Sequence, residues 1–463
     1  MQSKLRFRNV YPEVHKEKYE HVQPATSSSD SGLIKGNSKY LSFAWKVGGG
    51  GSLAVLELGK PQRLAPVIPL IKGHNAAIQD QDFNPFNDNV IATASDDTTL
   101  KVWEIPEEFT QDVTAPLANL QGHSKKVNFV QYHPSTENIL ASTSNDGTVK
   151  VWDVDRQCEA LTLTVPDANY WSLCWNSNGS LLGTTSKDKT TRIGDPRAQQ
   201  WVHELLTHEG SRAQKMTFLG DTGLILSVGF AKTTDREFKV WDIKNLTKPV
   251  QHVKIDQQAS VLYPFFDSDL GMLYLAGRGD GNIRYYEFAD GAFTYTSDHK
   301  STVPMKGIGF IPKRGVNVMR AELMRALKLT DNAIEFISFI QPRKASTFQE
   351  DLFPDCCSEI PAQTAEAWLA GNNAAPLRKS MKPDENAINR PSARSVISHG
   401  GTADVDRLKR ALEEANKEID SLKTGQAQSE DAEGAKHEIE KLKTELSAIA
   451  EEKAALEKKV HAQ

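Results

Sequence analysis

Two groups of histidine, hydroxyl and carboxylate side chains are the first residues whose types could support catalysis. They have the same spacing and consist of His74, Thr93 and Asp97, and of His123, Ser142 and Asp146. A hydroxyl nucleophile, a histidine base and an aspartate are the parts of a hydrolytic triad. An enzyme needs such a triad once, whereas here the group recurs along the chain. The repetition favours a structural role, in which the side chains form hydrogen-bonded chains between strands.

Both groups belong to longer sequence repeats, at residues 73–103 and 122–153, which match the WD40 pattern. Three weaker copies follow. In every copy an aspartate stands six positions before the tryptophan or the residue in its place; the aspartates are Asp97, Asp146, Asp188, Asp235 and Asp280. In WD40 repeats a His, a Ser or Thr, an Asp and a Trp are hydrogen-bonded inside each blade. We therefore expect Trp103, Trp152 and Trp241 to complete such chains.

The repeats alternate short apolar or β-branched runs with turn residues, which is typical of antiparallel strands joined by tight hairpins. A single four-stranded blade cannot bury its own faces, so radial stacking into a closed ring is favoured. At about 40–45 residues per blade, seven blades fit before residue 340. We predict an all-β fold, a seven-bladed WD40 β-propeller over residues 1–340, closed by an N-terminal strand that pairs into the last blade.

The chain after residue 340 changes character. Residues 341–371 carry Phe353 and Trp368 as large anchors, and we expect them to pack on the propeller as a C-terminal extension. Residues 372–403 lack bulky apolar side chains, which indicates a flexible linker. Residues 404–463 are dominated by Ala, Glu, Lys and Leu, and we expect an α-helical coiled coil there.

The predicted coiled-coil seam is a pair of apolar stripes that repeat at alternating spacings of four and three residues. Its members are Leu408, Leu412, Ala415, Ile419 and Leu422, then Ile439, Leu442, Leu446 and Ile449, continued by Leu456 and Val460. Gly425 and Gly434 lie between the two stripes, which are out of phase by one residue. Such a narrow stripe predicts a homo-oligomer; a lone solvated helix is the alternative.

Composition excludes several classes of function. The formal net charge is only −5, and the basic segments are not interleaved with aromatic residues, so nucleic-acid binding is disfavoured. No apolar stretch approaches the ~20 residues of a membrane helix, and four scattered cysteines indicate a reducing compartment. The glycine run 48–51 lacks the Lys-Ser/Thr pair of a phosphate loop and predicts a hairpin turn. We expect a soluble cytoplasmic protein with no transmembrane segment, no catalytic site, no metal and no cofactor.

Two basic regions could meet an acidic surface, although a solvated run of charge is the alternative for each. The first comprises Lys4, Arg6, Arg8, Lys16 and Lys18. The second comprises Arg378, Lys379 and Lys382 in the linker, with Arg407, Lys409 and Arg410 at the start of the predicted helix.

Several segments outside the repeats resemble the coronin family. They are FRNVY at residues 7–11, GRGDGNIRYYE at 277–287, GFIPK at 309–313, FQEDLFPD at 348–355 and TAEAWLAG at 364–371. The resemblance implies binding to actin filaments, and regulation of filament turnover with cofilin and the actin-related-protein branching complex. It also implies a place in the actin-rich cortex of the cytoskeleton. Filament sides are acidic and repetitive, so weak basic contacts linked by a coiled coil would gain avidity.

Two positions depart from the family pattern. Gln23 stands where the family commonly has a functionally important arginine, and residues 407–412 lack the glutamate of the trimer signature found in some coronin coiled coils. Dimer and trimer therefore both remain open. The alternative function, from another class, is a WD40 scaffold that presents a peptide-binding propeller face and does not bind actin.

Overall fold

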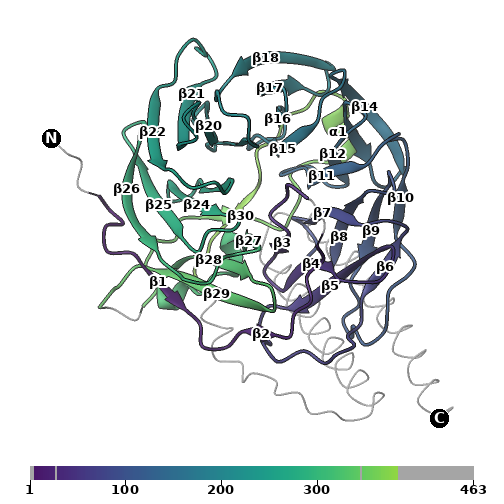
Figure 1. Ribbon diagram of the computed structural model, residues 1–463, viewed down its shortest axis with the longest axis horizontal. Helices are drawn as coiled ribbons and strands as arrows, with labels where there is room; N and C mark the ends of the chain where they lie inside the picture. Colours follow the sequence, from purple (N-terminus) through teal and green to yellow (C-terminus); the bar gives the residue numbers. More distant parts are fainter. Residues whose placement is uncertain (1–4, 27–28, 345–346, 384–463) are drawn as a thin grey trace, which may run out of the picture. The chain divides into compact units, whose positions relative to one another are not determined.

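The computed structural model describes residues 5–26, 29–344 and 347–383, which belong to one compact unit (Figure 1). Seven antiparallel sheets form a ring around a central axis. The seven-bladed propeller predicted from the repeats is therefore confirmed. The predicted coiled-coil seam lies outside the described residues, as do Lys4, Arg407, Lys409 and Arg410.

Six blades are built from four consecutive strands each, and the first strand of each lies nearest the axis. Blade 1 contains β3 (Ile34–Gly36), β4 (Tyr40–Trp45), β5 (Gly51–Glu57) and β6 (Ile71–His74). Blade 2 contains β7 (Ile78–Phe83), β8 (Val90–Ser95), β9 (Leu100–Glu104) and β10 (Ala118–Leu120). Blade 3 contains β11 (Val127–Tyr132), β12 (Ile139–Ser144), β13 (Thr148–Asp153) and β14 (Cys158–Thr164).

The next three blades follow the same plan. Blade 4 contains β15 (Tyr170–Trp175), β16 (Leu182–Ser186), β17 (Thr190–Asp195) and β18 (Gln200–Leu206). Blade 5 contains β19 (Lys215–Phe218), β20 (Leu224–Phe230), β21 (Arg236–Asp242) and β22 (Gln251–Asp256). Blade 6 contains β23 (Leu262–Asp267), β24 (Met272–Gly277), β25 (Ile283–Ala289) and β26 (Ala292–His299).

Blade 7 is completed by the start of the chain, as predicted. It contains β27 (Gly307–Phe310), β28 (Glu322–Leu329) and β29 (Ala333–Ile340), joined by β1 (Tyr11–Val14) and β2 (Tyr19–Glu20), with the short 3₁₀ turns η1 (Lys313–Gly315) and η2 (Val318–Arg320) between β27 and β28. In Figure 1 the purple β1 lies along the green β29. The register is antiparallel and places Tyr11 opposite Ile340. This pairing covers the strand edge that an open ring would expose.

The glycines at 48–51 lie at the hairpin between β4 and β5, which confirms the predicted turn. Gly50 has a φ of +69°, a conformation that favours glycine, and a Cβ there would lie 2.8 Å from the carbonyl oxygen of His74. The run is therefore explained by backbone geometry.

The C-terminal extension packs against the propeller through one short helix and one small sheet. The helix α1 (Ala365–Leu369) begins at Thr364, whose side chain accepts a hydrogen bond from the backbone N–H of Ala367. Strand β30 (Cys356–Cys357) pairs with β31 (Arg378–Lys379), so paired structure continues past residue 371, where the sequence predicted a linker. Phe353 and Trp368, the expected anchors, are both buried. No helix within the described ranges is long and apolar enough to cross a membrane.

Candidate functional site

The first histidine group forms a hydrogen-bonded chain between the last strand of blade 1 and the middle strands of blade 2. His74 Nδ1 lies 2.8 Å from Asp97 Oδ2 and His74 Nε2 lies 2.8 Å from Thr93 Oγ1. The indole N–H of Trp103 donates to the same threonine oxygen at 2.9 Å. Burial alone would raise the pKa of Asp97, but hydrogen bonds from His74 and Thr99 hold it well below its usual range. The chain ties the end of β6 in blade 1 to β8 and β9 of blade 2.

Blade 3 repeats this arrangement with a serine. His123 lies 3.0 Å from Asp146 and 2.8 Å from Ser142 Oγ, which also accepts the indole N–H of Trp152 at 2.8 Å. Both Ser142 and Trp152 are fully buried. A hydroxyl buried in this way is closed to a substrate, so the structural interpretation of the groups is confirmed and the hydrolytic one fails.

Blade 5 contains a third chain, which Trp241 completes as predicted. His208 lies 3.0 Å from Ser227 Oγ, which accepts the indole N–H of Trp241 at 2.9 Å. The carboxylate beside His208 Nδ1, at 2.9 Å, belongs to Glu237 and not to Asp235, the residue at the repeated spacing. Hydrogen bonds from His208, Lys239 and His252 outweigh burial and lower the pKa of Glu237 to about 2. Glu237 therefore takes the place that the aspartate has in blades 2 and 3.

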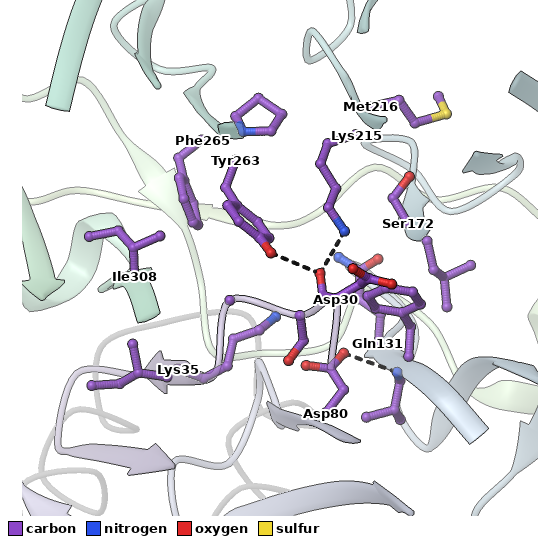
Figure 2. Close-up of a pocket in the computed structure, with 17 residues that line it drawn as sticks. Asp30, Lys35, Asp80, Gln131, Ser172, Lys215, Met216, Tyr263, Phe265 and Ile308 are labelled. Carbon is purple, nitrogen blue, oxygen red and sulfur yellow. Dashed lines mark hydrogen bonds between the residues drawn. The ribbon is translucent and has the colours of Figure 1, made fainter. Parts of the chain in front are cut away.

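The axis of the ring contains a cavity of about 160 Å³ that is lined by both charged and apolar side chains (Figure 2). Its lining residues come from the first strands of all seven blades, together with the segment 30–32. Charged groups face it from three strands: Lys35 on β3, Asp80 on β7 and Lys215 on β19. Sequence reasoning missed this cluster, because its members are far apart in the chain and carry no repeating signal.

The acidic side of the cavity joins the inner strands of neighbouring blades. Asp80 accepts the backbone N–H of Val130 at 3.2 Å, and Asp82 accepts that of Tyr132 at 2.9 Å, so β7 is bonded to β11 through side chains. The ammonium of Lys35 lies 3.1 Å from Asp82. Burial raises the pKa of Asp80 to about 6, although Lys35 opposes that shift.

Lys215 on the opposite side of the cavity has no carboxylate within ion-pair distance among the described residues. Its Nζ donates to the carbonyl oxygens of Asp30, at 2.6 Å, and Trp171, and lies about 5 Å from the ring centroids of Phe129 and Tyr263. Burial without an anionic partner lowers the pKa of Lys215 to about 8. A buried ammonium of this kind costs stability.

Replacing Lys215 with methionine is expected to raise the free energy of unfolding at pH 7 by about 1 kcal/mol. The lowered pKa corresponds to a penalty of about 3 kcal/mol, against two lost hydrogen bonds of about 1 kcal/mol each. Because the folded-state pKa lies below the unfolded one, the penalty is complete below about pH 8 and disappears as the pH rises through about 10.5. The advantage of the variant should therefore vanish at high pH.

Urea unfolding of both proteins at pH 7 and at pH 10 measures this difference. Lys125→Met is the control, because Lys125 is exposed and should change the midpoint little at either pH. A Lys215→Met protein less stable than the wild type at pH 7 would contradict the argument.

The segment 29–33 crosses one end of the axial cavity and is fixed by donors from blades 5 and 6. The carbonyl oxygen of Asp30 accepts bonds from Lys215 and, at 3.1 Å, from the Tyr263 hydroxyl (Figure 2). The carbonyl oxygen of Ser29 accepts a bond from the Arg278 guanidinium, and the Ser31 hydroxyl donates to the Gln79 carbonyl at 2.9 Å. The segment is thereby held across this end of the axial cavity.

The first predicted contact region lies along blades 6 and 7. The backbone N–H groups of Arg6 and Phe7 donate to the Glu287 carboxylate on β25, both at 2.9 Å, so the segment is docked before it enters β1. The side chains of Arg8 and Lys16 are exposed and have no ion pair among the described residues. Lys18 lies 3.5 Å from Glu20, and the Arg6 guanidinium covers the Phe7 ring.

The second predicted region is partly engaged within the protein. Arg378 donates to Asp269 at 2.9 Å and to the carbonyl oxygen of Asp355 at 2.6 Å, and Lys379 pairs with Glu359. Lys382 is exposed. No hydrogen bond or ion pair between described residues joins this region to the first, so the structure presents them as separate groups.

Comparison with protein families matches five segments of the chain. The model described as a WD domain, G-beta repeat, matches residues 66–104, 114–153 and 160–195, and a second type of WD40 repeat matches residues 334–376. Residues 2–63 match a domain of unknown function, DUF1899. The DUF1899 match covers the start of the chain, which docks on blade 6, forms β1 and crosses one end of the axial cavity.

Known relatives are similar over most of the described fold. Coronin-A of Dictyostelium discoideum is 42% identical over 382 residues, which are 81% of this chain and 85% of the relative. A coronin-like protein of Schizosaccharomyces pombe is 38% identical over 380 residues, 80% of this chain, but the match spans only 63% of that relative. The WD40 domain of Toxoplasma gondii coronin, a crystal structure, superposes with a TM-score of 0.79 at 40% identity, covering 81% of this chain and 98% of that one. The chain therefore belongs to the coronin family.

Proposed function

We propose that this protein binds the sides of actin filaments and regulates the organisation of the actin cytoskeleton as an oligomer. Membership of the coronin family supports an actin-associated role. The observation that carries direct binding is the exposed basic edge of blade 7, where Arg8 and Lys16 have no acidic partner among the described residues. Cations left free in this way are available to an acidic protein surface.

Oligomerisation is part of the proposal, because single surface contacts of this kind are weak. Linking several propellers through residues 404–463 would convert later contacts into intramolecular ones and raise the overall affinity. Cofilin and the actin-related-protein branching complex are the proposed partners in filament turnover, in the cytoplasm at the actin-rich cortex.

The test is co-sedimentation of the full chain with filamentous actin at low and high salt. We expect the wild type to pellet with filaments, and the double charge reversal Arg8→Glu and Lys16→Glu to reduce the affinity about tenfold, which is 1.4 kcal/mol. A chain that ends at Thr402 should also bind more weakly, because it lacks the predicted coiled coil. The molar mass of both chains in solution measures oligomerisation directly.

Lys244→Glu with Lys248→Glu is the matched control. Both lysines are exposed in the turn that follows β21 in blade 5, so the change of net charge is the same on another part of the ring. Equal loss of pelleting in the control and in the blade 7 variant would assign binding to net charge alone. Absence of pelleting by the wild type at low salt would reject actin binding.

A further inference from the structure

A buried lysine beside the axis of the ring lacks an anionic partner. Lys215 on β19 is 4% exposed, and no carboxylate of the described residues lies within ion-pair distance of its ammonium. Two of its three N–H donors are used, by the carbonyl oxygens of Asp30 and Trp171. The Nζ atom also lies about 5 Å from the ring centroids of Phe129 and Tyr263, which line the axial cavity. The cavity wall therefore carries a positive charge and a donor that this part of the chain leaves unmatched.

Anchoring of the segment 29–33 does not explain the charge. Lys215 does hold this segment, but the neutral hydroxyl of Tyr263 donates to the same Asp30 carbonyl oxygen at 3.1 Å. A neutral donor can thus make the anchoring bond without burying an ammonium, which is costly when it has no counter-ion. Departures of this kind from the usual rules of burial concentrate at functional sites.

The axial cavity continues into a wider one, of about 530 Å³, at the end of the ring opposite to the segment 29–33. Residues at and after the ends of β3, β7, β11, β23 and β27 line this wide cavity. It shares four lining residues with the axial cavity: Lys35, Gln131, Pro264 and Phe265. Strand β30 of the C-terminal extension also lines it and lies near the centre of the ring in Figure 1. Because a chain segment lies across each end, the space suits a small molecule better than a loop of a folded partner.

The wall shared by the two cavities is aromatic. Phe265 on β23 lines both of them, and its ring centroid lies 4.3 Å from that of Phe310. Both rings are only half-buried, so part of their surface faces the cavities. Met216 and Ile308 add apolar surface on the axial side, as Figure 2 shows. A planar apolar group can therefore pack against Phe265 in the same cavity that Lys215 lines.

The acidic residues of the axial cavity limit the charge of a ligand. Asp30 is exposed, so water hydrates its carboxylate, and Asp82 is paired with Lys35. Asp80 accepts the backbone N–H of Val130 at 3.2 Å, and burial raises its pKa to about 6. This carboxyl group would repel a doubly charged anion such as phosphate more strongly than a single carboxylate.

We propose that the axial cavity binds a small aromatic monocarboxylic acid. Its carboxylate accepts a hydrogen bond from the remaining N–H of Lys215, and its ring packs against Phe265. The ligand thereby supplies the counter-ion that the buried ammonium lacks. The site uses none of the basic residues of blade 7, so it does not rest on the proposed binding to actin.

The test is isothermal titration calorimetry of the full chain at pH 7 with sodium benzoate, phenylacetate and 3-phenylpropionate. The primary amide of each acid is the neutral comparison. We expect at least one acid to bind at least about tenfold more tightly than its amide, a difference of 1.4 kcal/mol. Lys215→Met should lower the affinity for that acid to the level of the amide. This variant is expected to be more stable than the wild type at pH 7, so unfolding would not account for the loss.

Lys125→Met is the matched control, because Lys125 is exposed and does not line the axial cavity. It should keep the affinity within about twofold of the wild type. The proposal is overturned if none of the three acids binds at millimolar concentrations, or if the Lys215→Met protein binds them as the wild type does. It is also overturned if sodium phosphate displaces the acid at equal concentration, since the site would then take any anion.

The pH dependence of binding tests the ammonium itself. The charged groups that act on Lys215 are Asp30, Asp80 and Arg278, and burial lowers the pKa of Lys215 to about 8. Between about pH 7 and about pH 9.5, Asp80 is already ionised and Tyr263 stays protonated, because burial raises their pKa values to about 6 and about 12. Lys215 loses its proton over this range while the ligand stays ionised, so the affinity should fall at least about tenfold. An affinity that does not change with pH would overturn the role of Lys215.

Discussion

Replacing Arg236 with methionine is expected to lower the free energy of unfolding by about 3–5 kcal/mol. Arg236 is fully buried at the start of β21 and binds Asp256 through two hydrogen bonds of 2.5 and 2.6 Å. It also binds Asp280 of blade 6 at 3.0 Å and Ser260 Oγ at 2.8 Å. Removing the guanidinium would leave the buried carboxylate of Asp280 with the backbone N–H of Asn282 at 3.0 Å and a longer contact to Arg284 at 3.4 Å. The loss would fall on the junction of blades 5 and 6.

Urea unfolding of the two proteins checks this value. Arg320→Met is the matched control, because Arg320 is 52% exposed and pairs with Glu13 at the surface, where an ion pair contributes about 0–1 kcal/mol. Adding Asp280→Asn to Arg236→Met should recover part of the loss, since it removes a buried charge that has lost its shorter ion pair. An Arg236→Met protein within about 1 kcal/mol of the wild type would contradict the buried-network interpretation.

Replacing Trp368 with alanine is expected to release the C-terminal extension, at a cost of about 3–5 kcal/mol. The indole is fully buried between blades 3 and 4, where its N–H donates to the Gly179 carbonyl at 3.2 Å. Its ring makes edge contacts with His133 and Trp175 at centroid distances of 5.0 and 5.8 Å. The Arg197 guanidinium lies over the ring at 5.3 Å. These contacts are the main apolar anchor of α1.

Hydrogen exchange and limited proteolysis measure the release. We expect faster exchange in β30, α1 and β31 and new cleavage after residue 341, while the blades stay protected. Leu377→Ala is the control, because Leu377 lies in the same extension but is 46% exposed and should cost little. Unchanged exchange in the extension of the Trp368→Ala protein would show that Trp368 is not its anchor.

Local repetition explains which features were predictable. The blade number, the histidine chains of blades 2 and 3 and the closing strand all follow from short motifs that recur at a regular period. Trp368 and Phe353 were identifiable as anchors because they are large apolar residues in a segment otherwise poor in them.

The third histidine chain shows where the repeat pattern fails. Asp235 keeps the repeated spacing but precedes β21, whose first residue, Arg236, turns its guanidinium to Asp256 and Asp280. The carboxylate for His208 comes from Glu237 instead, two residues further along. Glu237 points to the same face as Asp235 because strand side chains alternate. A pattern based on residue type alone cannot register this shift.

The charged residues around the axial cavity could not be predicted from the sequence for a different reason. Lys35, Asp80 and Lys215 come from β3, β7 and β19, and nothing in the sequence of their repeats sets them apart. Only closure of the ring brings them around Asp30.

For the basic regions, the sequence identified the charges but not their partners: Arg378 and Lys379 are engaged by Asp269 and Glu359.

Closure of blade 7 by the first strand has a consequence for biosynthesis. His15 and Ser338 are 323 residues apart and form a hydrogen bond of 2.7 Å in the finished protein. At the usual translation speeds of about 5–20 residues per second, the beginning of the chain leaves the ribosome roughly 15 s to 1 min before its partner strand exists. Until then the ring of blades is open, and its unpaired strand edges are exposed. Other chains can pair with these edges. A messenger RNA truncated before codon 333 would therefore produce a fragment that aggregates, because the ring closes only when β29 is present to pair with β1.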